Sequence, residues 1–178
     1  RATDISTDVL RAFGLEAKEL GTVVDVFTAT ITNSNTTIEM LGQSMKFVAP
    51  VASKLGYTVQ EVSAMLGVMS QSGIKAGMAG RSLRMAMMRL SGAASRFNME
   101  GKDLINVLKE MASKNYSPER LVSQLKTMFG LRSTPAILAL MQSLDLYDEF
   151  YEKLRHSEGA AQRFTDSLKT VWRSFKEL

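Results

Sequence analysis

The chain has 178 residues, 45% of them hydrophobic, and a formal net charge of +4 at pH 7. It contains no cysteine, which excludes a disulfide framework and thiolate metal ligands, and it lacks the dense Lys/Arg tract of a nucleic-acid-binding arm. With only three prolines and many Ala, Leu, Met, Glu and Lys residues, the composition favours an all-α protein, folded as one domain or as two small lobes.

The first two helices are predicted from apolar residues at helical spacing. Residues 5–13 form a short amphipathic pattern that ends at Gly14, and residues 16–32 carry a second stripe. The cluster Asn33-Ser34-Asn35 predicts the turn that follows.

The third helix is predicted to begin at a capping box formed by Thr36 and Glu39. Its apolar stripe runs to residue 55, and Gly56 ends it in the left-handed conformation that other residues disfavour. Pro50 lies inside this pattern and predicts a kink near residues 48–49.

The fourth helix is predicted to begin at a capping box of Thr58 and Glu61 and to end at Gly73. The fifth, about residues 75–95, is apolar on two faces, so we expect it to lie at the centre of the fold. One face carries Ala76, Ala79, Leu83, Ala86, Leu90 and Ala94, and the other carries Met78, Met85 and Met88. The expected solvated edge consists of Lys75, Arg81, Ser82, Arg84, Arg89 and Arg96.

Residues 91–103 change composition and predict a junction between an N-terminal lobe, residues 1–98, and a C-terminal lobe, residues 99–178. Helical periods beyond it cover residues 103–113, 118–129, 135–144, 146–156 and 160–178. Ser117-Pro118 and Thr134-Pro135 are predicted helix starts, each a capping hydroxyl followed by proline. The sequence therefore predicts an all-α, multi-helix bundle of about eight to ten short helices without a sheet.

Glycines and charged residues give no catalytic, cofactor or metal site. Gly73, Gly77 and Gly80 do not have the spacing of a phosphate loop, so we expect them, with Leu83, to serve close helix packing. The carboxylates of Asp145, Asp148, Glu149 and Glu152 share a helical face that is predicted to be solvated, although paired carboxylates also do acid–base chemistry elsewhere. His156 is the only histidine, and one histidine does not build a metal site.

Methionines and basic residues leave alternatives open. The 12 methionines fit a core, and the alternative is a groove for a partner helix. The basic edge fits a solvated face or a surface for an acidic protein better than a phosphate site, and we predict no specific nucleic-acid binding.

The last helix is the best candidate interface. Its apolar stripe, with Trp172 beside it, consists of Phe164, Leu168, Val171, Phe175 and Leu178. The alternative is that this helix folds back on residues 104–111. Because the stripe reaches the last residue without a cap, and the chain starts at Arg1 rather than methionine, we expect a piece of a longer protein.

Four segments carry a resemblance to a known family. They are LRAFGLEAKELGTVVDVF (residues 10–27), NSNTTIEMLGQSMKFVAPVASKLG (33–56), TVQEVSAMLGVMSQSGIKAGMAGRSLR (58–84) and MFGLRSTPAILALM (128–141). In this order they resemble the core region of phage tail tape measure proteins.

The resemblance implies a structural component of a phage or prophage tail that sets tail length and is ejected ahead of the DNA. It implies self-association, contacts with tail tube, tail-tip or baseplate and tail assembly chaperone proteins, and a place in the tail lumen after assembly in the host cytoplasm. The chain is too often interrupted by Gly and Pro to be the ruler rod, so we expect a compact module without enzymatic activity. Two alternatives remain: a membrane-active module that helps DNA cross the host envelope, although the longest uncharged runs are shorter than the about 20 residues of a spanning helix, and a general helical adaptor.

Overall fold

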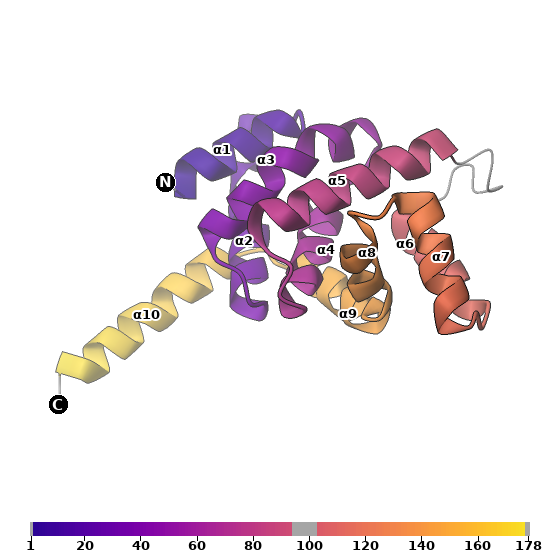
Figure 1. The fold of residues 1–178 in the computed structure, drawn as a ribbon. Coiled ribbons are helices and arrows are strands. Elements are labelled where there is room, and N and C mark those ends of the chain that lie inside the picture. The colour runs from indigo at the N-terminus through magenta and orange to yellow at the C-terminus, as the bar shows by residue number, and fades with distance from the viewer. Residues whose placement is uncertain (1, 94–102, 177–178) are drawn as a thin grey trace.

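A computed structural model describes residues 2–93 and 103–176 of the chain (Figure 1). These residues form ten α-helices and one 3-10 turn, Ala17–Glu19, with no strand among them, which confirms the all-α prediction. The α-helices are α1 Ala2–Ala12, α2 Leu20–Asn33, α3 Ile38–Lys54, α4 Val59–Gln71, α5 Ala76–Ala93, α6 Leu104–Ser113, α7 Pro118–Phe129, α8 Thr134–Met141, α9 Leu144–Arg155 and α10 Ala160–Lys176.

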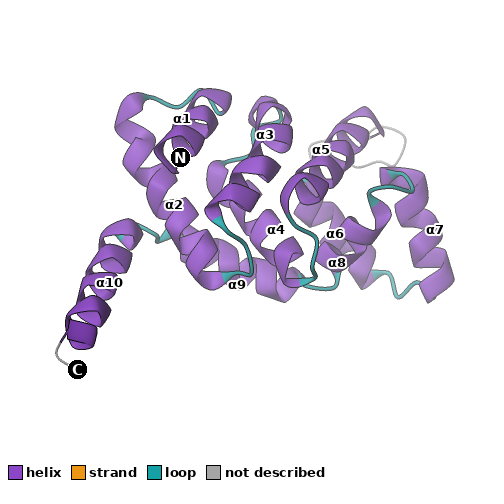
Figure 2. Ribbon diagram, turned by 60° about the vertical axis from the view of Figure 1, so that its left-hand side comes forward, coloured by secondary structure: helices purple, strands orange, loops and turns teal. Residues whose placement is uncertain are grey.

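Helices α1 to α9 form one body, and α10 projects from it (Figures 1 and 2). Helix α3 packs between α1 and α5, and α4 packs against both α2 and α9. Buried apolar residues from all nine helices of the body join one hydrophobic core. The predicted junction lies largely in residues 94–102, outside the described residues, and the division into two lobes stays a prediction.

Several helix ends follow the predicted local rules. Thr58 Oγ1 accepts a hydrogen bond from the Glu61 N–H, and the Glu61 carboxylate accepts one from the Thr58 N–H at 2.7 Å, which confirms that capping box. Gly56 and Gly73 have φ values of +83° and +79°, as the predicted turns require. Ser117 caps α7, with Pro118 in its first turn.

Two predicted helix starts are wrong by one residue. The cap of α3 is Thr37, whose Oγ1 accepts from the Met40 N–H, so the Thr36–Glu39 capping box does not form. At α8 the cap position is Ser133. The Thr134 hydroxyl lies inside the helix and donates to the Gly130 carbonyl at 2.9 Å. At the start of α3 two neighbouring threonines both offer a hydroxyl, and Thr37 is the one that caps the helix. At α8 neither hydroxyl caps the helix, because Ser133 makes no side-chain cap hydrogen bond.

The prediction that α5 is covered on both faces is also wrong. Ala79, Leu83, Ala86 and Leu90 are buried, whereas Met78, Met85 and Met88 are 52%, 43% and 46% exposed. Ser82, expected at the solvated edge, is buried. The body packs against the side of α5 that carries the buried residues, and none of the described helices covers Met78, Met85 and Met88 enough to bury them. Ala94 and Arg96 lie outside the described residues.

Candidate interaction surfaces

The described residues contain no group of three or more His, Cys, Asp or Glu side chains that could hold a metal ion. Among the helices described, none combines the length and hydropathy needed to cross a membrane. The features that stand out are surfaces, so the candidate site is an interaction site.

Helix α10 is attached to the body through its first turn. The Asp25 carboxylate, on α2, accepts hydrogen bonds from the Gly159 N–H at 2.8 Å and the Ala161 N–H at 2.9 Å. These N–H groups belong to a helix start, where no intrahelical acceptor exists and negative charge is favoured. Asp25 therefore caps α10 across 134 residues of sequence. Sequence reasoning missed this role, although a lone carboxylate on an otherwise apolar helix was the available signal.

We expect the replacement Asp25→Ala to loosen the start of α10. The substitution removes both cap hydrogen bonds, and loss of an N-terminal cap typically costs about 1 kcal/mol. Hydrogen exchange should accelerate several-fold at the amides of Gly159 and Ala161 and stay unchanged in α4. Asp166→Ala, on the exposed surface of α10, serves as the control. Equal protection of both amides in the Asp25 variant and the wild type would show that Asp25 does not hold α10.

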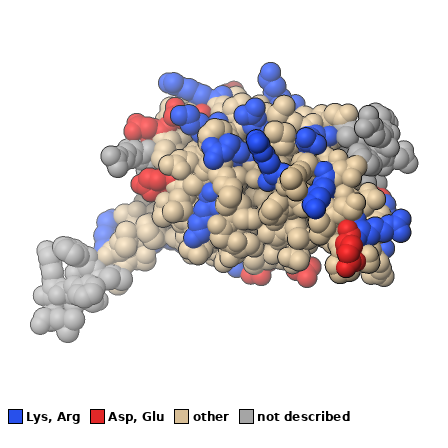
Figure 3. Space-filling view, in the orientation of Figure 1, with Lys and Arg blue, Asp and Glu red and all other residues tan. Residues whose placement is uncertain are grey.

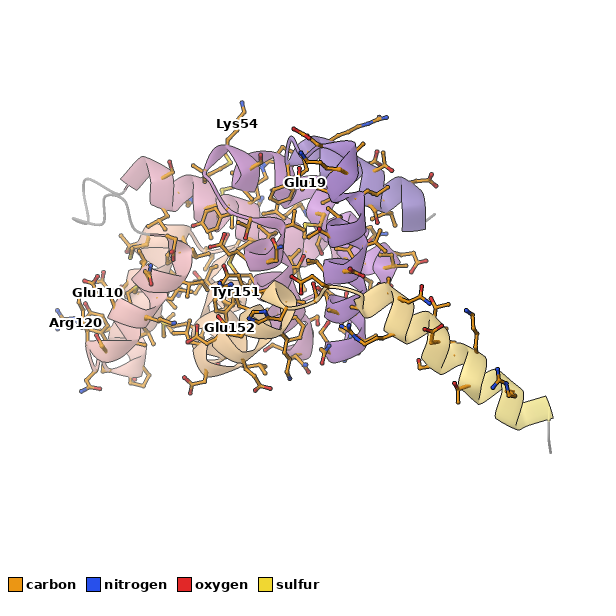
Figure 4. The ribbon with its side chains drawn as sticks, turned by 180° about the vertical axis from the view of Figure 1, so that it is seen from behind. Glu19, Lys54, Glu110, Arg120, Tyr151 and Glu152 are labelled. Carbon is orange, nitrogen blue, oxygen red and sulfur yellow. The ribbon has the colours of Figure 1, made fainter. Side chains whose placement is uncertain are left out.

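The predicted interface stripe lies on the projecting helix. Phe164 is 39% exposed and Leu168 is 53% exposed. Val171, Trp172, Phe175 and Leu178 continue the stripe in sequence, but their side chains lie outside the described residues. Helix α10 contacts α2 and leaves the body at the end opposite α6 and α7, whose Glu110 and Arg120 are labelled in Figure 4, so it does not fold back on α6.

The glycines expected to serve helix packing have different surroundings. A Cβ at Gly80 would lie 2.2 Å from the Ser44 carbonyl oxygen, so α3 and α5 approach closely there. At Gly77 a Cβ would meet the Phe47 ring and the Arg81 guanidinium at 3.2 and 3.1 Å. Gly73 has nothing within 4 Å of its Cβ position and lies in the turn before α5. Leu83 is fully buried on the core side of α5.

The Ser44 side chain adds a hydrogen bond at this crossing. Its hydroxyl lies 2.6 Å from the Ala76 carbonyl oxygen at the start of α5 and 3.0 Å from the Met40 carbonyl oxygen within α3. Ser44 thus contacts α5 through both its side chain and its backbone. This pair of contacts fixes the position of α5 on α3.

A second surface is a groove of about 470 Å³ between α1 and α3. Its lining includes apolar Ile5, Val9 and Met45, with Asp8 and Lys46 among its charged residues. The groove lies over Gly42, where a Cβ would meet the Ile5 side chain at 2.8 Å.

The acidic face of α9 carries exposed ion pairs. Asp148 pairs with Lys109 of α6 at 2.7 Å, and Glu149 pairs with Lys153 at 2.6 Å. The hydrogen bond and the charge of Lys153 lower the pKa of Glu149. His156 is exposed, with its Nε2 3.8 Å from Glu152. Three of the four carboxylates on this face, those of Asp148, Glu149 and Glu152, thus have a basic partner within 4 Å.

Tyr57 ties the start of α6 to the turn before α4. Its hydroxyl accepts a hydrogen bond from the Leu104 N–H at 2.8 Å. Burial is the largest influence on this phenol and raises its pKa to about 12. This long-range contact was not predicted, because no sequence signal links a tyrosine to a helix start 47 residues away.

We expect the folded chain to lose stability as the pH rises from about 10 to 12. The unfolded phenol loses its proton near pH 10, whereas the folded Tyr57 keeps it up to a pKa of about 12. Over that interval the unfolded state binds fewer protons, so stability falls with pH. Urea unfolding at several pH values should show a shallower decline for Tyr57→Phe. A parallel decline in both proteins would exclude Tyr57 as the source.

Comparison with known proteins decides the family. The family model described as phage-related minor tail protein matches residues 1–178, the whole chain. The chain belongs to this family.

Two curated relatives carry the name expected from the resemblance. The tape measure protein of Pneumococcus phage Dp-1 is 32% identical over 184 residues, which cover 90% of this chain and 15% of that protein. The probable tape measure protein of Escherichia phage P2 is 25% identical over 179 residues, which cover 89% of this chain and 22% of that protein.

Membership among the phage-related minor tail proteins confirms the predicted likeness to tape measure proteins. The chain spans less than a quarter of the length of these two relatives. No solved structure gave a significant match. The family is one of phage tail proteins, so the interaction surfaces described above are those of a phage tail protein.

Proposed function

We propose that the chain is a compact structural module of a tape measure protein, which sets tail length and is ejected ahead of the DNA. The observation that supports this most is the match of about nine-tenths of the chain to two relatives named tape measure proteins. The many short helices suit a module beside a rod rather than the rod itself. The module has no catalytic role in this proposal, and it acts in the tail lumen after assembly in the host cytoplasm.

The proposal that the parent protein sets tail length is tested by measuring tails of a phage that carries this chain. One helical residue advances about 1.5 Å, so an in-frame insertion of helical heptads in the parent gene should lengthen the tail by that amount per residue. Electron microscopy of purified particles measures the change. Tails of unchanged length with the inserted protein inside would contradict the ruler function.

In this proposal the module associates with copies of itself through α10, beside contacts with tail tube, tail-tip and assembly chaperone proteins. The support is the position of Phe164 and Leu168, which lie exposed on a helix that leaves the body (Figure 2). The predicted stripe has the alternating spacing of a coiled-coil seam but covers barely two heptads. A seam of this length is marginal alone, so the association should be weak.

We expect concentration-dependent association of the 178-residue chain, and Leu168→Lys should abolish it by placing a charge in the apolar seam. The helix content should not change, because Leu168 is more than half exposed. Gln162→Lys, an exposed change on another side of α10, is the control and should associate as the wild type does. Sedimentation velocity across a wide concentration range decides. A wild-type chain that stays monomeric throughout would contradict the interface.

A further inference from the structure

The exposed face of α5 has the pattern of a helix-packing seam. Met78, Arg81, Met85 and Met88 follow one another at intervals of three, four and three residues, and all four are exposed. That spacing aligns side chains along one stripe of a helix, as in the contact between two packed helices. Ten helical steps separate Met78 from Met88, so the stripe extends about 15 Å along the helix axis. The other side of α5 is already buried in the body, so this stripe is free for a second helix.

Contacts within the body hold the seam in place. The Arg81 guanidinium lies over the Phe47 ring of α3, 4.8 Å from its centre, so it is stacked rather than extended into water. Gly77 leaves room for this pair, because a Cβ there would press on both side chains. Arg81 thus lies against the Phe47 ring at its position in the stripe. Methionine adapts its shape to a partner more readily than branched side chains do.

Among the described residues of α5, the charged side chains that flank the seam are all basic. Arg84 and Arg89 are exposed on its two flanks, the positions that carry interhelical ion pairs in paired helices. No Asp or Glu occurs between Glu61 and Glu100 in the sequence. Within the described part of the chain, no ion pair involves Arg81, Arg84 or Arg89. Figure 3 shows Lys and Arg across the middle of the face that carries α5, with Asp and Glu toward its edges.

We propose that the Met78–Met88 face of α5 docks an amphipathic helix of another protein, one with apolar residues along its seam and Asp or Glu on its flanks. A second copy of α5 does not fit, because it would bring the arginines of both copies together. The α10 helix of a second copy does not fit either, since its described surface carries Arg163, Lys169 and Arg173 against Asp166. This docking site does not depend on the proposed function of α10.

A lipid surface fits the same face less well. Helices that lie in a membrane interface bury a broad apolar face, typically with Trp, Phe or Leu. The exposed face of α5 has a single row of methionines with Arg81 among them. This row is a narrow stripe of the kind that packs against one helix. Charge complementarity with a narrow apolar seam favours an acidic helix.

Two synthetic helical peptides of about three heptads test the proposal. Both have Leu along the seam, and one has Glu and the other Lys at the flanking positions. Fluorescence anisotropy with the 178-residue chain should show binding of the Glu peptide at least about tenfold tighter than that of the Lys peptide, and the difference should shrink as salt is raised. Equal affinity for the two peptides, or no binding of either, would overturn the proposal.

Substitutions locate the binding face. Met85→Ser combined with Met88→Ser should weaken binding of the Glu peptide about tenfold. Leu168→Ser, an equally exposed apolar change on α10, should leave it unchanged. Arg84→Glu should weaken binding of the Glu peptide and strengthen binding of the Lys peptide. Circular dichroism establishes that each variant is folded. Binding that survives the double methionine change, or vesicles of phosphatidylglycerol that bind the chain through these methionines while the Glu peptide does not, would overturn the assignment.

Discussion

Gly80→Ala should destabilise the chain by about 3 kcal/mol, although alanine is the better helix former. A Cβ at this position would lie 2.2 Å from the carbonyl oxygen and 2.7 Å from the Cα of Ser44. Both atoms are backbone, so no rotation of a side chain relieves the overlap and α3 must move away from α5. Overpacking of this kind costs about 1–3 kcal/mol. The movement would also stretch the Ser44 hydrogen bond to Ala76.

Gly92→Ala is the matched control on the same helix. Nothing lies within 4 Å of the Cβ position at Gly92, and the residue is exposed. Alanine there should stabilise the chain by about 0.5–1 kcal/mol through its helix propensity. Urea unfolding followed by circular dichroism measures both variants. If the two substitutions shift the urea midpoint in the same direction, the result would contradict the close approach of α3 and α5 at Gly80.

Leu83→Asp should unfold the chain. Leu83 is fully buried on the side of α5 that faces the core, and no described cation in the core could pair with a carboxylate there. A buried unpaired charge costs several kcal/mol, and the cavity left by the leucine adds to that cost. Together they approach the about 5–15 kcal/mol that stabilises a typical domain.

Two variants define what the Leu83→Asp result means. Leu83→Met keeps the volume and polarity and should cost less than about 1.5 kcal/mol. Glu149→Ala removes an exposed side chain whose partner is Lys153, and such changes are usually within about 0.5 kcal/mol. Thermal unfolding with circular dichroism compares all three. Equal midpoints for Leu83→Asp and Glu149→Ala would contradict the burial of this face of α5.

The successes of sequence reasoning about helix ends are features that depend on residues within one helical turn of each other. The Thr58–Glu61 capping box, the Ser117-Pro118 start and the positive φ angles of Gly56 and Gly73 are all local features. Their energy comes from hydrogen bonds and backbone angles that the neighbouring residues determine. The cap of α3 shows the limit, because Thr36 and Thr37 both offer a hydroxyl there and the sequence pattern predicted the wrong one.

The apolar periods of α5 predicted two buried faces, but only the arrangement of its neighbours decided which face is covered. A hydrophobic stripe indicates which side chains are suited to burial. It does not indicate whether another helix packs against them. For the same reason the sequence did not reveal that Asp25 caps α10, or that Gly80 lies directly against the backbone of Ser44. The sequence by itself determined the helices, most of their ends and the family. The tertiary structure decided the contacts between distant residues, because these depend on how whole helices pack and not on any one segment.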